Sequence, residues 1–181
     1  MSKPKKFIEK VSYKIDSQNK IIEVYDSWKN AAEVGKASEK LDPNSVLDKY
    51  ILNYVTGDVT KVYYYIMYTE CRRLKKKLSL TYRCDSPTHK RFMEMEMIPE
   101  EDNCITIENF LLKEEPFKHP VHIKDETENL LIPPRFLRCA ICNSLKIDDE
   151  WVLPENIPAN KEKEYKVIHS ICPTCQENKL P

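Results

Sequence analysis

Two matched cysteine pairs near the end of the chain constrain its fold more than any other sequence feature. Cys139 and Cys142 form the first pair, Cys172 and Cys175 form the second, and 29 residues separate the pairs. Two residues between cysteines allow both sulfurs of a pair to bind one metal ion through a tight turn, and two such pairs complete a tetrahedral site. The spacing therefore predicts a closed, structural zinc site, with residues 146–166 forming a loop or hairpin outside it.

The same segment is compatible with three other arrangements. His169, three residues before Cys172, could replace one cysteine as a ligand or donate a hydrogen bond to a sulfur. A catalytic zinc site would need an open position and a nearby carboxylate, for which Asp149 and Glu150 are close in sequence. A thiol redox sensor would use the C-terminal pair, but such pairs usually open a helix in a βαβ unit. We favour the structural site because the polar, proline-containing sequence around the cysteines would hardly fold without the ion.

Alternating apolar and polar residues indicate strands in the first 115 residues. The alternation is seen at 11–15, 22–24, 78–82, 93–97 and 105–107. Turn-forming residues at 16–19 join the first two segments into a predicted β-hairpin. Strands with one apolar and one polar face are typical of an antiparallel sheet that buries one side.

Helical spacing of apolar residues separates the hairpin from the last three predicted strands. Ser45 could cap a short helix over 45–54, and Gly57 suits the end of that helix. A second helix is predicted over 58–75, and its last turn carries the basic residues favoured there by the helix dipole. Two strands, helices and three strands predict an α+β fold, with helices on one face of a five-stranded antiparallel sheet.

The order of elements and the cysteine motif together resemble a bacterial PAS-like family, whose members carry a cysteine-rich C-terminal segment. In the sheet region the similar segments are Tyr13–Asp16, Trp28, Val46–Leu47, Arg83–Pro87 and Arg91–Glu96. In the tail they are Cys139–Cys142, Trp151 and His169–Cys175. The resemblance implies a sensory domain followed by a zinc motif. The expected parts are a PAS-like domain at 7–115, a proline-containing linker at 116–134 and the cysteine-rich zinc motif at 135–181.

A PAS-like fold also implies a pocket between the helices and the inner face of the sheet. Aromatic and flexible apolar side chains would form its wall, and a polar turn at the end of the sheet would read a ligand or partner. The candidate pocket residues are Trp28, Tyr63, Ile66, Met67, Cys84, Asp85, Arg91 and Met95. Ordinary core packing and a tight turn explain the same residues, so both interpretations stay open. The ligand would be an unidentified small molecule.

Charge and hydropathy restrict the partners and the location of the chain. Its 29 basic residues balance its 29 acidic ones, and residues 131–181 carry seven of each sign, whereas nucleic-acid-binding proteins usually have a basic excess or patch. We therefore do not expect a nucleic-acid partner. No run approaches the ~18 apolar residues of a membrane span, and the start lacks the apolar core of a secretory signal. The chain is expected to be soluble and cytoplasmic, with no membrane partner.

These observations favour a non-enzymatic sensory, regulatory or protein-interaction module with a structural zinc ion. The two glycines argue against glycine-rich phosphate loops, and the predicted parts leave no room for a separate catalytic domain. Output would then pass through a protein partner or a homodimer. The alternative functions are a zinc-ribbon regulator that binds nucleic acid and a thiol-based redox sensor that uses the C-terminal cysteine pairs.

Overall fold

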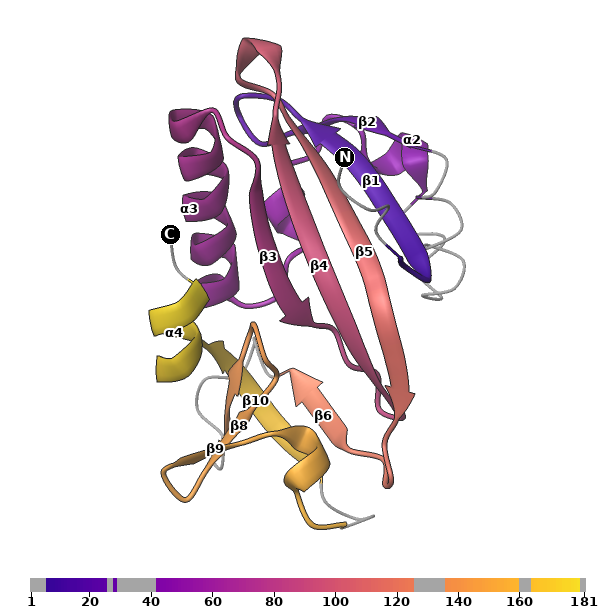
Figure 1. Cartoon of the computed structure of the whole chain (residues 1–181), viewed down its shortest axis with the longest axis vertical. Coiled ribbons are helices and arrows are strands. Elements are labelled where there is room, and N and C mark those ends of the chain that lie inside the picture. Colours follow the sequence, from indigo (N-terminus) through magenta and orange to yellow (C-terminus); the bar gives the residue numbers. More distant parts are fainter. Residues whose placement is uncertain (1–5, 26–27, 29–41, 126–135, 160–163, 180–181) are drawn as a thin grey trace.

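The computed structural model describes residues 6–25, 28, 42–125, 136–159 and 164–179. Two five-stranded sheets form its framework (Figure 1). The first sheet is antiparallel and has the strand order β2-β1-β5-β4-β3. Its strands are β1 (Glu9–Ile15), β2 (Ile21–Val24), β3 (Leu78–Arg83), β4 (His89–Pro99) and β5 (Ile105–Pro116). The predicted α+β fold with a five-stranded antiparallel sheet is confirmed at this level.

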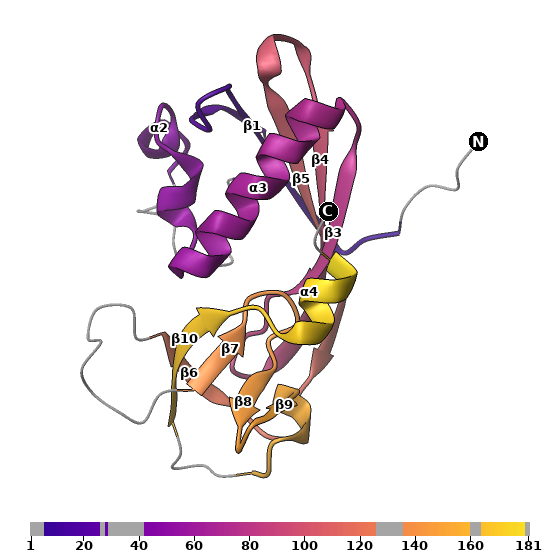
Figure 2. The ribbon, with the colours of Figure 1, turned by 90° about the vertical axis from the view of Figure 1, so that its left-hand side faces the viewer.

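Helices cover one face of the first sheet, as expected. The long helix α3 (Asp58–Leu74) lies across this face, and the short elements α2 (Pro43–Val46) and η1 (Ile51–Tyr54), the latter a 3-10 turn, lie nearer β1 and β2 (Figure 2). Apolar side chains from the strands meet the inner face of α3. The fully buried ones include Ile15, Ile21, Met97, Ile105 and Ile107 from the sheet and Tyr68 and Cys71 from α3. Among the described residues, no helix is long and apolar enough to span a bilayer.

The prediction of one continuous helix over 45–54 is wrong, because the segment forms two separate short turns, α2 and η1. Its first turn, α2, is capped by the Asp42 side chain, which accepts a hydrogen bond from the Asn44 amide, and not by Ser45. After that turn Asp48 adopts a positive φ of 59°, and the chain then follows the start of β2. The Ile21 amide donates to the Lys49 carbonyl at 2.9 Å. Hydrogen bonds to a distant strand thus replace the i to i−4 bonds that would have continued the helix.

The C-terminal part forms a second, mixed sheet with the order β6-β10-β7-β8-β9. Its strands are β6 (His122–Asp125), β7 (Phe136–Cys139), β8 (Leu145–Ile147), β9 (Glu150–Val152) and β10 (Glu164–Ser170), followed by the helix α4 (Pro173–Lys179). Strand β10 runs parallel to both β6 and β7, and β7-β8-β9 are antiparallel. The predicted hairpin outside the metal site corresponds to β8 and β9.

The predicted linker is partly structured. Residues 122–125, expected in the linker over 116–134, instead form β6 and pair with β10, while residues 126–134 lie outside the described residues. The expected small zinc motif is therefore the end of a larger sheet with its own apolar cluster. That cluster consists of Leu145, Ile157, Tyr165 and Val167.

The two sheets are joined through buried contacts. The Arg83 amide at the end of β3 donates to the Ile141 carbonyl at 2.8 Å, and the Arg83 side chain reaches Glu155 in the 3-10 turn η3 (Pro154–Asn156). Cys139, Cys172 and Cys175 belong to the same buried cluster as the core of the first sheet. The cysteine motif therefore packs directly on the helix-covered domain.

Candidate metal centre

Strand pairing brings the two cysteine motifs to the same edge of the second sheet. Strands β7 and β10 are parallel neighbours, and Cys139 in β7 pairs with Ser170 in β10. Parallel neighbours end at the same edge, so the turn after β7 and the turn after β10 lie side by side. Each turn contains one C-x-x-C motif, although the motifs are far apart in sequence.

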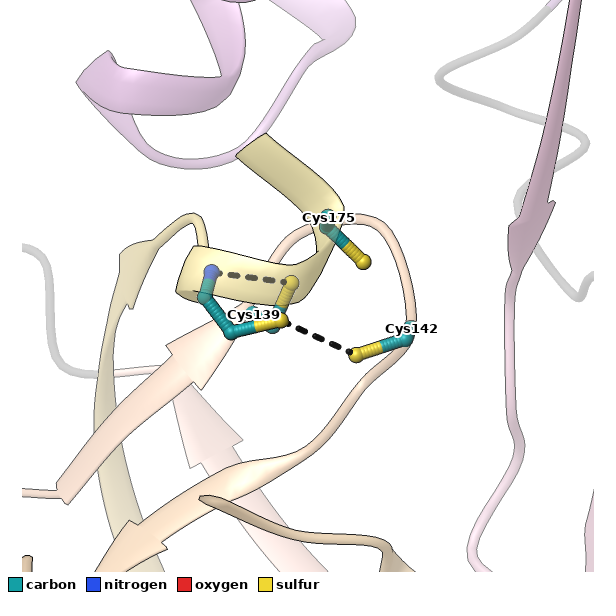
Figure 3. A group of neighbouring side chains, drawn as sticks. Cys139, Cys142 and Cys175 are labelled. Atoms are coloured by element: carbon teal, nitrogen blue, oxygen red, sulfur yellow. Dashed lines mark hydrogen bonds between the residues drawn. The ribbon is translucent and has the colours of Figure 1, made fainter. Parts of the chain in front are cut away.

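Backbone hydrogen bonds fold each motif into a compact turn. In the first, the Asn143 amide donates to the Cys139 carbonyl at 3.0 Å, the Cys139 amide donates to the Ser144 carbonyl at 2.8 Å, and Asn143 takes a positive φ of 65°. In the second, Pro173 begins α4 and places Cys175 in its first turn. Both turns direct their two sulfurs toward the same point; Figure 3 shows the converging side chains of Cys139, Cys142 and Cys175.

The sulfur positions match those required by a tetrahedral metal ion. All four Sγ atoms lie within 4.8 Å of one another, and those of Cys142 and Cys172 are 3.7 Å apart. A zinc ion with Zn–S bonds of about 2.3 Å sets its sulfurs about 3.8 Å apart at the corners of a tetrahedron. All seven cysteines are free, so no disulfide competes for these sulfurs. The cluster is therefore suited to hold one metal ion.

Hydrogen bonds around the cluster favour a thiolate at Cys142, whereas burial opposes the ionisation of Cys139 and Cys175. The Cys172 amide donates to the Cys139 sulfur, with N and Sγ 3.4 Å apart, and the Ser144 hydroxyl lies 3.1 Å from the Cys142 sulfur. A hydrogen bond from Cys139 lowers the pKa of Cys142 to about 4, and this bond together with burial raises the pKa of Cys139. Burial and the negative charge of Cys142 raise the pKa of Cys175 to about 12. Ionisation of Cys139 and Cys175 therefore needs a cation beside their sulfurs, and a metal ion bound there would displace these protons.

His169 lies beside the cluster in sequence but faces another partner. Its Nε2 atom is 3.0 Å from Asp125 Oδ1 in β6, and its Nδ1 atom is buried without a hydrogen bond. This hydrogen bond lowers the pKa of Asp125. The ring thus ties β10 to β6, and the group of metal-ligating side chains consists of the four cysteines without His169.

The carboxylates considered for a catalytic zinc site are turned away from the sulfurs. The side chain of Asp149 is 94% exposed and pairs with Lys146 at 2.9 Å. Glu150 opens β9 and is also exposed. With four sulfurs converging on one point, the arrangement is that of a closed site.

The candidate pocket residues fall into two separate groups. Trp28, Tyr63, Met67 and Met95 are buried together in the core of the first sheet, where the Trp28 ring packs edge-on against Tyr13. Ile66 does not line this core, because it lies on the outer face of α3 and is 40% exposed. The first group is therefore explained by core packing.

Asp85 lies at the junction of the sheets, with Cys84 and Arg91 next to it. Asp85 accepts from the Arg91 amide at 3.0 Å, the Arg91 side chain lies near Glu114, and Cys84 is exposed. A cavity of about 60 Å³ opens beside Asp85. This volume has room for ordered water between the polar groups that line it.

Two interactions at the junction were not predicted from the sequence. Arg83 is buried and binds Asp85 at 2.7 Å and Glu155 at 2.9 Å, which links β3 to η3. Gly57, just before α3, lies so close to His169 that a Cβ atom added there would be 2.6 Å from the His169 Cβ. In sequence Arg83 follows Ser79 and Thr81 on the polar side of the predicted strand, so no local pattern indicated that its side chain would be buried.

Comparison with known protein families finds no match for the chain, and no curated protein is significantly similar to it in sequence.

Proposed function

We propose that the chain is a non-enzymatic regulatory module in which a PAS-like sheet domain is joined to a tail held together by a structural zinc ion. The convergence of four free cysteine sulfurs within 4.8 Å carries this proposal. Zinc is the ion that best fits a tetrahedral set of four thiolates. The free thiols also suit a reducing compartment, and we place the protein in the cytoplasm.

The closed set of ligands supports a structural and not a catalytic role for the metal. Catalytic zinc sites keep one position open for water or substrate, whereas four cysteines occupy all four positions. The short strands of the second sheet bury few apolar side chains of their own. Metal binding, worth about 10–16 kcal/mol in structural zinc sites, would supply the stability that this small core lacks.

Packing between the two parts supports the regulatory side of the proposal. Tyr63 on the inner face of α3 is buried, and burial together with the charges of Cys175 and Cys139 raises its pKa to about 12. A change in the packing of α3 would therefore alter the surroundings of the cysteine sulfurs. A signal from this domain would then pass to a partner through a protein surface.

Metal analysis of the purified chain tests the proposal. We expect about one zinc per chain, loss of zinc in Cys142→Ser, and full zinc content in Cys104→Ser, which alters a cysteine outside the cluster. Alkylation of the native protein should leave the cluster protected. A chain without metal, or a disulfide between the C-terminal cysteines, would overturn the zinc site, and native mass spectrometry of the same sample would reveal a retained ligand or partner.

A further inference from the structure

The outer face of α3 carries exposed apolar side chains, and no described element lies over this side of the helix (Figure 2). Its inner face supplies Tyr63 and Met67 to the core, but Val59, Val62, Tyr65 and Ile66 point outward and are 41%, 60%, 51% and 40% exposed. Four large apolar side chains within about two helical turns form a contiguous patch. Such patches mark contact surfaces more often than isolated exposed apolar residues do.

A hollow beside this patch extends it toward η1. It has a volume of about 370 Å³ and is lined by Tyr50, Leu52, Asn53, Lys61, Val62 and Tyr65. Apolar side chains make up most of its floor, and Lys61 and Asn53 add polar groups. The hollow could receive a large side chain from a second molecule, such as a tyrosine.

The charges at the two ends of α3 are complementary to each other. Asp58 stands in the first turn with its carboxylate exposed, and Arg73 stands in the last turn, followed by the lysines at 75–77. Asp58 lies seven residues before Tyr65, and Arg73 lies seven residues after Ile66. Seven residues are close to two helical turns, so each charge lies on the same side of the helix as the patch.

We propose that this face of α3 is the contact surface of a symmetric dimer of the chain, in which two α3 helices pack antiparallel. A two-fold axis between Tyr65 and Ile66 sets Asp58 of each copy opposite Arg73 of the other and places the apolar patches in contact. The same surface is then used by both copies, as in most homodimers. Antiparallel helix dipoles add to the attraction.

The partner that covers this face of α3 is a second copy of the chain, because the patch is complementary to itself. Its acidic and basic ends lie at equal distances from the apolar centre, so an antiparallel two-fold pairing of two copies satisfies both ends at once. One helix face about 25 Å long is smaller than the ~800 Å² per partner of a standard interface, so the dimer should be reversible and concentration-dependent. This inference does not depend on the metal site.

Sedimentation of the full chain over a wide concentration range tests the proposal. The wild type should shift from monomer toward dimer as the concentration rises, and Val62→Glu should remain monomeric at every concentration. Ile22→Glu is the matched control, because Ile22 is similarly exposed but lies on β2, and it should behave as the wild type. Both substitutions are at exposed positions, and circular dichroism checks that the fold is retained.

Charge reversal tests the antiparallel register. Arg73→Asp should weaken the dimer, and the added change Asp58→Arg should restore it, because both intermolecular pairs are then reversed. The intrahelical pairs of Asp58 with Lys61 and Arg73 with Glu70 are exposed and worth only about 0–1 kcal/mol, so the fold should persist. A wild type that stays monomeric, a Val62→Glu protein that still dimerises, or a double variant that is no stronger than Arg73→Asp would each overturn the proposal.

Discussion

Replacement of Gly57 by alanine tests the contact between the two parts of the molecule. Gly57 precedes α3 with φ of 83° and ψ of 129°, a conformation open to glycine but strained for a residue with a Cβ atom. The new Cβ would also lie 2.6 Å from both Cβ and Cγ of His169. The His169 Cβ is fixed to the backbone of β10, so the strand or the start of α3 must move.

The expected loss of stability in Gly57→Ala has two sources. The strained backbone costs about 1–3 kcal/mol. Displacement of His169 breaks its hydrogen bond to Asp125, and a bond to a charged group is worth about 1.5–3 kcal/mol. The free energy of unfolding should therefore fall by about 2.5–6 kcal/mol, a large part of the ~5–15 kcal/mol of a typical domain.

Urea unfolding followed by tryptophan fluorescence measures this loss. Trp28 reports on the first sheet and Trp151, in β9, on the second. A His169→Gly background removes the clashing atoms, so Gly57→Ala should cost only the backbone strain of about 1–3 kcal/mol there. An alanine variant as stable as the wild type, or one with the same cost in both backgrounds, would refute the reasoning.

Three further outcomes are expected. Arg83→Leu leaves Asp85 buried without its cation and should lower the free energy of unfolding by about 3–5 kcal/mol in urea; a cost near zero would contradict the junction described above. Phenol absorbance should show Tyr13 and Tyr63 ionising only near their raised pKa of about 12, above the pKa of about 10 of a tyrosine in an unfolded chain. The unfolded chain loses these protons at lower pH than the folded protein. The contribution of these tyrosines to the free energy of unfolding should therefore be fully present below about pH 10 and fall as the pH rises above it. In a Tyr63→Phe variant the free energy of unfolding should fall less over the same pH range. Addition of a chelator should shift the Trp151 emission toward that of an exposed indole, and unchanged emission would mean that the second sheet does not need the metal.

The first sheet was predictable because its strands carry a local signal. Met93, Met95 and Met97 alternate with polar residues, as expected for a strand that is buried on one side. The structure places Met95 and Met97 in the core and pairs their strand with β5. The helix over 45–54 was wrong because its interruption depends on a distant partner. The Asp48 amide donates to the Ile21 carbonyl at 2.8 Å, a bond that no pattern within the segment encodes.

The cysteine cluster was predictable for a similar reason, since its spacing is a local property of each pair. The sheet around it was not. Strands β8 and β9 have three residues each, too few to show a period, and β6 pairs in parallel with β10, which begins about 40 residues later. The exposure of Ile66 likewise depends on long-range packing, because it is decided by which face of α3 lies against the sheet. The same holds for the hydrogen bond between His169 and Asp125, which joins two strands that are distant in sequence.

Packing of the metal centre on the first sheet gives the cysteines a role beyond holding a local turn. Cys139, Cys172 and Cys175 are buried in one cluster with Tyr63 and the core of the helix-covered sheet. If the sulfurs bind an ion, the position of α3 affects the free energy of metal binding, because α3 supplies part of the wall around them. By thermodynamic linkage the bound ion must then stabilise the same position of α3 by an equal amount. The outer face of α3 is the proposed dimer surface. The position of this one helix would therefore couple metal binding, the packing of the core and self-association.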